Sequence, residues 1–297
     1  MTSLSRRDWF AACAAGAACA AGAGAIEPIV RTGKPRLKLS LAAYSFRQWL
    51  DLKKKPKPDM TLADFIDFAA AQDIDAVELT EYYFPETSPE YLAGLRFQST
   101  RLGLDVSGTA ISNDFCVLDD DKRKAAVAKV KAWVEHTSRL GGKTIRIFAG
   151  NVPKGDSEEK ARERVVAAIE ESCDFAAKYG IYLALENHGG ITSTAEQVLA
   201  IVKAVRHDHF GLNLDTGNFH TADPYADLEK IAPYGVVVQV KTEVAPNGKA
   251  RDADLSRVVE ILRKANYRGY VALEYEAKED AKVAVPRHLA TLRKLFG

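Results

Sequence analysis

Cysteine is scarce in this chain, which has four cysteines among 297 residues. Cys13 and Cys19 lie within the segment 1–25, so Cys116 and Cys173 are the two that remain beyond it. Two cysteines do not make a disulfide framework, which excludes a small fold stabilised mainly by disulfides. The length and the 47% hydrophobic content instead allow one domain with a large apolar core.

An excess of charge of one sign is also missing. The chain has 41 basic and 40 acidic residues, and leaving out Arg6, Arg7 and Asp8 of the segment 1–25 leaves 39 of each. This balance predicts no attraction to nucleic acid or to an anionic membrane. No Gly-x-Gly-x-x-Gly motif follows the first expected strand, so the sequence does not favour a dinucleotide-binding fold.

The amino-terminal segment, 1–25, is typical of an export signal. Arg6 and Arg7 precede an Ala/Gly-rich stretch, 11–25, that closes with a small-x-small pattern. We predict a twin-arginine signal peptide over 1–25 and a periplasmic or secreted mature protein. An N-terminal membrane anchor and a degenerate lipoprotein site at Cys19 are the alternatives. The stretch is short and poor in Leu and Ile for a bilayer span, so stable membrane insertion is not expected.

Beyond a polar linker at 26–35, short β-rich runs alternate with longer helical stretches. We expect strands near 38–46, 76–80, 104–111, 144–150, 181–188, 210–216, 236–242 and 270–276. We expect helices near 61–72, 89–102, 121–140, 157–179, 194–206, 224–232, 254–265 and 279–295. Eight β-then-α units predict parallel strands covered by helices, and hence a single α/β domain, a (β/α)8 TIM barrel, at 36–297.

Polar and apolar side chains alternate along the last four expected strands. Leu183 and Leu185, for example, alternate with Glu186. We expect the apolar set to face the helices and the polar set to face the barrel axis. The inward polar residues at the strand ends are Glu186, His188, Asp215, Gln239, Lys241, Glu274 and Glu276. Barrel enzymes place their chemistry at this carboxyl-terminal end.

Four of these strands each offer one oxygen ligand at the same depth. The four residues are Glu186, Asp215, Gln239 and Glu274. A single Glu at a strand end is usually a solvated rim residue, but four oxygen donors in register favour a shared role. If the four strands are neighbours in the barrel, these residues predict one divalent-cation site.

The same stretches resemble the xylose-isomerase-like TIM barrels, a family of sugar isomerases, ketohexose 3-epimerases, inosose dehydratases and, more distantly, endonuclease IV. The motifs are Leu-Glu-Asn-His at 185–188, Asp-Thr-Gly-Asn-Phe at 215–219, Val-Gln-Val-Lys at 238–241 and Leu-Glu-Tyr-Glu at 273–276. The resemblance implies one divalent ion bound by Glu, Asp, His and Glu. Gln239 stands where the family has His, which favours Mn²⁺ or Mg²⁺ over Zn²⁺.

The resemblance also implies a proton shuttle through a cis-enediolate, with Glu186 and Glu274 taking and returning the proton. We therefore expect a metal-dependent isomerase or epimerase of a sugar or polyol ketone. A lyase or dehydratase acting on a 3-keto-glycoside or an inosose is the alternative within enzymes, and a non-catalytic sugar-binding barrel is the alternative of another class. A nuclease of the endonuclease IV type needs a His-rich metal cluster, which six His residues and no basic stripe do not support.

Other inward or strand-end residues are candidates for supporting roles. Lys241 would act as an electrophile or, with its pKa lowered by the ion, in proton transfer, or would be a plain ion-pair partner. His188 would orient substrate or a carboxylate, or be structural. Candidates for substrate contact are Glu78, Asn113, Arg146, Asn218 and His220, and a barrel-filling or ion-paired role is the alternative for the first three. Aromatic candidates for stacking on a sugar are Phe46, Trp49, Tyr82, Tyr83 and Phe115. A carbohydrate is the expected partner, and a homo-oligomer is compatible with the sequence.

Overall fold

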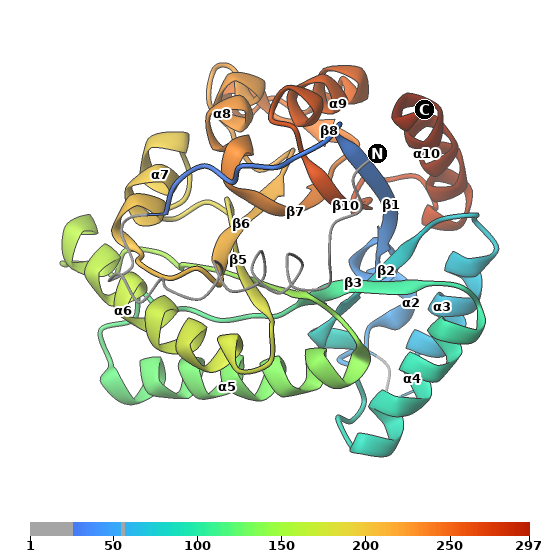
Figure 1. The fold of residues 1–297 in the computed structure, drawn as a ribbon, viewed down its shortest axis with the longest axis horizontal. Helices are drawn as coiled ribbons and strands as arrows, with labels where there is room; N and C mark the ends of the chain where they lie inside the picture. The colour runs from blue at the N-terminus through green and yellow to red at the C-terminus, as the bar shows by residue number, and fades with distance from the viewer. Residues whose placement is uncertain (1–25, 55–56) are drawn as a thin grey trace, which may run out of the picture.

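Eight parallel strands close into a barrel in the computed structural model, which describes residues 26–54 and 57–297 (Figure 1). Around the barrel the strands follow the order β1-β10-β7-β6-β5-β4-β3-β2. They are β1 (Arg36–Ala42), β2 (Ala76–Thr80), β3 (Asp105–Ala110), β4 (Thr144–Ile147), β5 (Tyr182–Glu186), β6 (Phe210–Asp215), β7 (Gly235–Val240) and β10 (Arg268–Leu273). The predicted (β/α)8 barrel is therefore confirmed, whereas the predicted signal at 1–25 lies outside the described residues.

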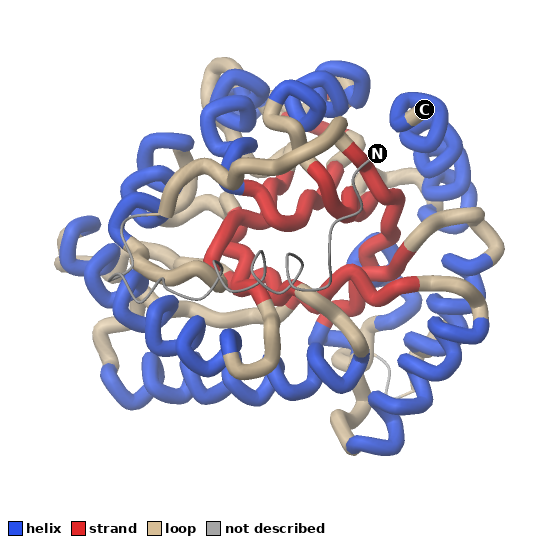
Figure 2. Tube along the Cα trace, viewed as in Figure 1, coloured by secondary structure: helices blue, strands red, loops and turns tan. Residues whose placement is uncertain are grey.

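A ring of helices surrounds the strands, as Figure 2 shows. The main helices are α3 (Leu62–Ala70), α4 (Pro89–Arg101), α5 (Asp120–Leu140), α6 (Glu158–Ala177), α7 (Ala195–Ala204), α8 (Pro224–Ile231), α9 (Leu255–Lys264) and α10 (Ala281–Phe296). Local caps fix several starts: Thr61 and Asp64 form a reciprocal capping box at α3, and the Ser157 side chain accepts from the first turn of α6. No helix in the described ranges is long and apolar enough to span a bilayer.

Several strands end earlier than the sequence predicts, β1 by the most, and one hairpin was not predicted. β1 ends at Ala42 and not at 46, because the chain turns into the short helices η2 (Ala43–Phe46) and α2 (Arg47–Leu50). The Ser45 hydroxyl donates to the Leu273 carbonyl at 3.1 Å and pulls η2 across the end of β10. After β7 the chain forms an unpredicted two-stranded hairpin, β8 (Glu243–Val244) and β9 (Arg251–Asp252).

Both cysteines of the described chain, Cys116 and Cys173, are buried and unpaired. Cys173 lies on the buried face of α6, within the core. Burial raises the pKa of the Cys116 thiol to about 12. These thiols are therefore small core residues, because a buried, protonated thiol is a poor nucleophile.

Gly108 lies at a close approach between β3 and β4. The pairing of β2 with β3 shifts register beside it, so that Glu78 lies opposite Gly108. A Cβ atom there would come within 2.3 Å of the Thr144 hydroxyl and 2.6 Å of the Thr144 carbonyl oxygen.

We expect Gly108→Ala to lower the free energy of unfolding by about 1–3 kcal/mol through overpacking. Urea unfolding would measure this loss. Gly94→Ala, where a Cβ meets nothing within 4 Å, is the matched control, and equal stability of the two variants would contradict the prediction.

Candidate active site

The four predicted ligand positions lie side by side around one half of the barrel mouth. Their strands are adjacent in the order β5-β6-β7-β10, and the register places Asp215 beside Gln239. Glu186, Asp215 and Gln239 end or nearly end their strands, and Glu274 follows β10 directly. All four residues are at most 4% exposed. Parity and strand order alone are therefore enough to bring these groups to one buried place.

Lys241 lies at the centre of the acidic groups. Its Nζ is 2.5 Å from Glu274 Oε2, 2.7 Å from Glu276 Oε2 and 3.4 Å from Asp215 Oδ2. Burial alone would lower the pKa of Lys241, but these three carboxylates outweigh it and raise the pKa well above the ordinary value. Without an added ion Lys241 is therefore a fixed ammonium, which is opposite to the lowered pKa expected beside a metal.

Glu186 is held on both oxygens. Arg146 Nε lies 2.9 Å from its Oε2, and the Asn218 amide donates to its Oε1 at 2.8 Å. Arg146 is itself fixed, because it donates to the Ile111 carbonyl at 2.8 Å and stacks on the Phe148 ring. Burial raises the pKa of Glu186 in spite of this guanidinium. Arg146 and Asn218, which were predicted to contact substrate, thus also contact Glu186, a predicted catalytic carboxylate.

Gln239 connects the acidic groups through its amide. Its Oε1 accepts from the Asn213 amide at 2.6 Å, and its Nε2 donates to Glu78 at 2.7 Å and lies 3.5 Å from Glu274 Oε1. Burial and the charge of Glu274 raise the pKa of Glu78 to about 7. Glu78 supports Gln239 from inside the barrel and is not among the described residues that line the mouth cavity. This position favours the barrel-filling alternative over substrate contact.

Two other predicted contacts have structural partners or lie further out. The Asn113 side chain exchanges two hydrogen bonds with the backbone of Phe148, at 2.7 and 2.9 Å, which favours its structural alternative. His220 is exposed and lines hollows beside the central cavity. His188 packs on Phe148 with ring centroids 4.3 Å apart and lines the cavity itself. Partial burial, with Arg146 and Lys241 nearby, lowers the pKa of His188, so the neutral imidazole is favoured at neutral pH.

The central cavity has a volume of about 180 Å³ and opens at the carboxyl-terminal end of the barrel. Its lining residues are Tyr44, Tyr82, Arg146, Phe148, Glu186, His188, Asn218, Lys241, Glu274 and Glu276. Two further hollows, of about 190 and 270 Å³, share Asn218 with it. Of the aromatic candidates Tyr82 lines the cavity, whereas Phe46 and Phe115 are buried in the core, which contradicts a stacking role for those two. Carboxylates, amides and aromatic rings in one small hollow suit a polyhydroxylated ligand.

The charge balance at this end of the barrel fits a divalent cation. Four buried carboxylates, Glu78, Glu186, Asp215 and Glu274, lie here with two buried cations, Arg146 and Lys241, which leaves a deficit of two positive charges. Asp215 Oδ2 is buried without a hydrogen-bond partner, and its nearest cation is Lys241 at 3.4 Å. Burial raises the pKa of Asp215 to about 7. Burial raises the pKa of Glu78 and of Glu186 as well, so protonation of two of these three carboxylates would replace the two missing charges.

The carboxylate oxygens do not converge on a single point where a metal ion could bind. Within the described ranges no three His, Cys, Asp or Glu side chains are placed to hold a metal ion as they stand. The reason is that Lys241 separates Asp215 from Glu274, and Arg146 and Asn218 hold Glu186. The donors thus fit a cation in charge and in chemistry, and the four-residue site remains a prediction.

Three residues of the site were missed by the sequence analysis. Asn187 clasps the backbone of Asp215 with two hydrogen bonds of 2.9 Å, and Asn213 orients the Gln239 amide. Tyr44 lines the cavity from η2. Parity signals Asn213, which points inward on β6 with Asp215. Asn187 points away from the axis in the same alternation, so only the three-dimensional contact reveals its role.

Comparison with known proteins places this barrel among related enzymes. A family model described as the xylose isomerase-like TIM barrel matches residues 66–295. The 3-dehydroshikimate dehydratase of Bacillus anthracis is 24% identical over 213 residues, which cover 67% of this chain and 69% of the relative. The inosose isomerase of Bacillus subtilis (strain 168) is 26% identical over 195 residues, which cover 59% of this chain and 69% of the relative.

Solved structures agree on the fold. The crystal structure of D-psicose 3-epimerase in the presence of D-fructose has a TM-score of 0.72 at 20% identity, over 88% of this chain and 99% of that chain. The family match spans most of the sequence, on a closed barrel with eight parallel strands. The chain belongs to the xylose isomerase-like TIM barrel family.

Proposed function

We propose that this protein is an isomerase or epimerase of a sugar or polyol ketone. One observation carries the proposal: two buried carboxylates, Glu186 and Glu274, line the same small polar cavity, and each is held by a cation. Paired carboxylates of this kind can remove a proton from carbon and return it. The isomerase and dehydratase relatives support the same type of chemistry.

The proposed reaction begins when one carboxylate removes the proton beside the substrate carbonyl. The C–H electron pair becomes the carbon–carbon double bond of a cis-enediolate, and the carbonyl electrons move onto oxygen. The ammonium of Lys241 and the guanidinium of Arg146 lie at the cavity wall, where positive charge stabilises that oxyanion. Return of the proton to the opposite face of the same carbon is epimerisation, and its return to the neighbouring carbon is isomerisation.

A divalent cation, when bound, would supply further Lewis-acid stabilisation of the enediolate oxygens. Glu186, Asp215, Gln239 and Glu274 are the residues that would hold it, and an all-oxygen set favours Mn²⁺ or Mg²⁺. Asp215 is the best prepared of the four, because its Oδ2 has no hydrogen-bond partner. Its Oδ1 accepts from the Gly217 and Asn218 N–H groups at 2.8 and 3.0 Å, which fixes the carboxylate plane.

Elimination from a larger substrate is the second candidate function. The hollows that share Asn218 with the central cavity extend the mouth, and they would accept a second ring or substituent. The enediolate oxygen then re-forms the carbonyl, the carbon–carbon double bond shifts to the β carbon, and the β carbon–oxygen bond breaks. The leaving oxygen takes up the proton held by the protonated carboxyl group, which gives a lyase or dehydratase for a 3-keto-glycoside or an inosose. The dehydratase relative supports this second function. Export directed by residues 1–25, as proposed, would place the enzyme in the periplasm, where it would meet glycosides.

The test is incubation of the purified protein, with Mn²⁺ or Mg²⁺ supplied, with ketohexoses, inososes and 3-keto-glycosides in deuterated water. We expect solvent deuterium at the carbon beside the carbonyl of at least one substrate, because proton return uses exchanged solvent protons. Mass spectrometry and NMR of the product separate epimerisation, isomerisation and elimination. Binding of these sugars without any deuterium uptake or product would instead identify a non-catalytic sugar-binding barrel.

A further inference from the structure

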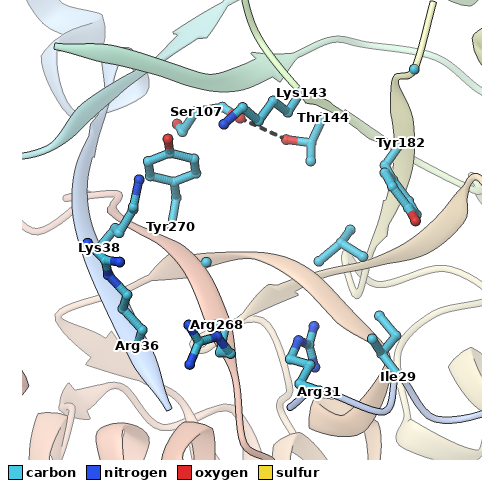
Figure 3. Close-up of a pocket in the computed structure, with 13 residues that line it drawn as sticks. Ile29, Arg31, Arg36, Lys38, Ser107, Lys143, Thr144, Tyr182, Arg268 and Tyr270 are labelled. Atoms are coloured by element: carbon cyan, nitrogen blue, oxygen red, sulfur yellow. Dashed lines mark hydrogen bonds between the residues drawn. The ribbon is translucent and has the colours of Figure 1, made fainter. Parts of the chain in front are cut away.

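A second cavity lies at the opposite end of the barrel from the acidic site. Its volume is about 560 Å³, and its walls come largely from the amino-terminal ends of β1, β4, β5, β7 and β10 (Figure 3). The lining residues are Ile29, Arg31, Arg36, Lys38, Ser107, Lys143, Thr144, Gly180, Tyr182, Val236, Arg268, Gly269 and Tyr270. The cavity is larger than the central cavity of the candidate active site and shares no lining residue with it.

Positive charge is concentrated in this cavity. Five of its lining residues are cationic, namely Arg31, Arg36, Lys38, Lys143 and Arg268, and none of the described lining residues is acidic. The whole chain has a formal net charge of only +1, so this concentration is local. Like charges gathered around one cavity repel one another and cost stability unless an anion binds among them.

Nearby carboxylates neutralise only part of this charge. Asp105 lies 3.6 Å from Lys38 and accepts from the Tyr270 hydroxyl at 2.5 Å. Asp75 is occupied by the backbone N–H of Leu39 at 2.7 Å. With both carboxylates counted against the five cations, an excess of three positive charges remains. The excess is large enough to attract a multiply charged anion.

Aromatic rings hold several of the cations in place. The Nζ atoms of Lys38 and Lys143 lie over the Tyr270 ring, 5.0 and 5.8 Å from its centroid. Arg31 stacks over Tyr267 and donates to the Gly235 carbonyl, yet its Nη1 is buried without a hydrogen-bond partner. Burial lowers the pKa of Arg31, as it does for a cation that lacks a facing anion. The charges are therefore partly preorganised.

We propose that this cavity binds a small molecule with two or more phosphate or sulfate groups. Guanidinium and ammonium donors on opposite walls match such groups, and the Tyr182 hydroxyl adds a polar group to the lining (Figure 3). A volume of about 560 Å³ is typical of small-molecule sites.

Isothermal titration calorimetry with tripolyphosphate and with a trisulfated disaccharide tests the proposal and separates phosphate from sulfate ligands. We expect saturable binding of at least one probe with a dissociation constant below about 1 mM, and weaker binding as salt is added. The double variant Arg36→Ser/Lys143→Ser should weaken binding at least about tenfold, because charge-assisted hydrogen bonds are lost. Neither side chain has a hydrogen bond or ion pair within the described residues, so folding should persist, which circular dichroism checks.

The matched control is Lys203→Ser/Lys294→Ser, which removes two exposed lysines on α7 and α10 and the same charge. Equal weakening by the control would show non-specific attraction to net charge and would overturn the proposal. Absence of saturable binding of both probes to the unmodified protein would overturn it too. The measurement needs no sugar substrate, so its outcome is independent of the proposed isomerase activity.

Discussion

Glu274→Gln is expected to lower the rate of deuterium exchange into substrate by about 10²- to 10⁴-fold. Gln has nearly the same shape as Glu but cannot accept the proton from carbon. Its amide would still lie beside Lys241, which keeps two other carboxylate partners, Asp215 and Glu276. The loss should therefore appear as a lower kcat in steady-state assays with the substrate found in deuterated water.

Glu186→Gln should cause a loss of the same order, because the two carboxylates work as a pair. The double variant should lose little more than either single one, since residues that act as a unit are not additive. Glu260→Gln, an exposed carboxylate on α9, is the matched control and should keep full activity. Unchanged turnover in both single variants would remove the proton shuttle and favour a sugar-binding barrel.

The acidic half of the site could be predicted because strand alternation has a period of two residues. Once Leu183 and Leu185 face the helices, Glu186 must face the axis, and the same holds for Asp215 and Gln239 on the neighbouring strands. Side-chain partners do not follow from this alternation. It places Lys241 inward, but it does not reveal that the Lys241 ammonium contacts three carboxylates.

Contacts distant in sequence explain what the pattern missed. β1 ends at Ala42 because Ser45 binds Leu273, a residue 228 positions away, and no local signal contains that partner. The cationic cavity likewise joins Arg31 and Lys38 with Lys143 and Arg268, which become neighbours only when the barrel closes. Local sequence motifs therefore reveal the acidic site, because each of its predicted ligands lies in a recognisable strand-end motif. They do not reveal the cationic cavity.

Lys241→Met should destabilise the protein by about 3–5 kcal/mol at pH 8, because it removes the buried partner of several carboxylates. The loss should be smaller at pH 5. Burial raises the pKa of Glu78 and Asp215 to about 7, so the folded protein binds these protons more tightly than the unfolded chain. Stability from these two groups is thus present at low pH and is lost as pH rises through about 7. At pH 5 bound protons would replace the missing ammonium.

Urea unfolding of the unmodified protein and of Lys241→Met, at pH 5 and pH 8 with a chelator, measures this effect, with Lys203→Met on α7 as the exposed control. Mn²⁺ or Mg²⁺ added at 100 times its dissociation constant should raise the unfolding free energy of the unmodified protein by about 2.7 kcal/mol. More cation should be needed at pH 5, because protons on Asp215 and Glu78 compete with it. Equal stability of Lys241→Met and the unmodified protein at pH 8 would contradict the role of the Lys241 ammonium as the charge partner of the buried carboxylates. If neither cation stabilised the protein at pH 8, the charges of Asp215, Glu274 and their neighbours would be balanced by bound protons and Lys241 alone. The metal ligands assigned from the strand ends would then be wrong.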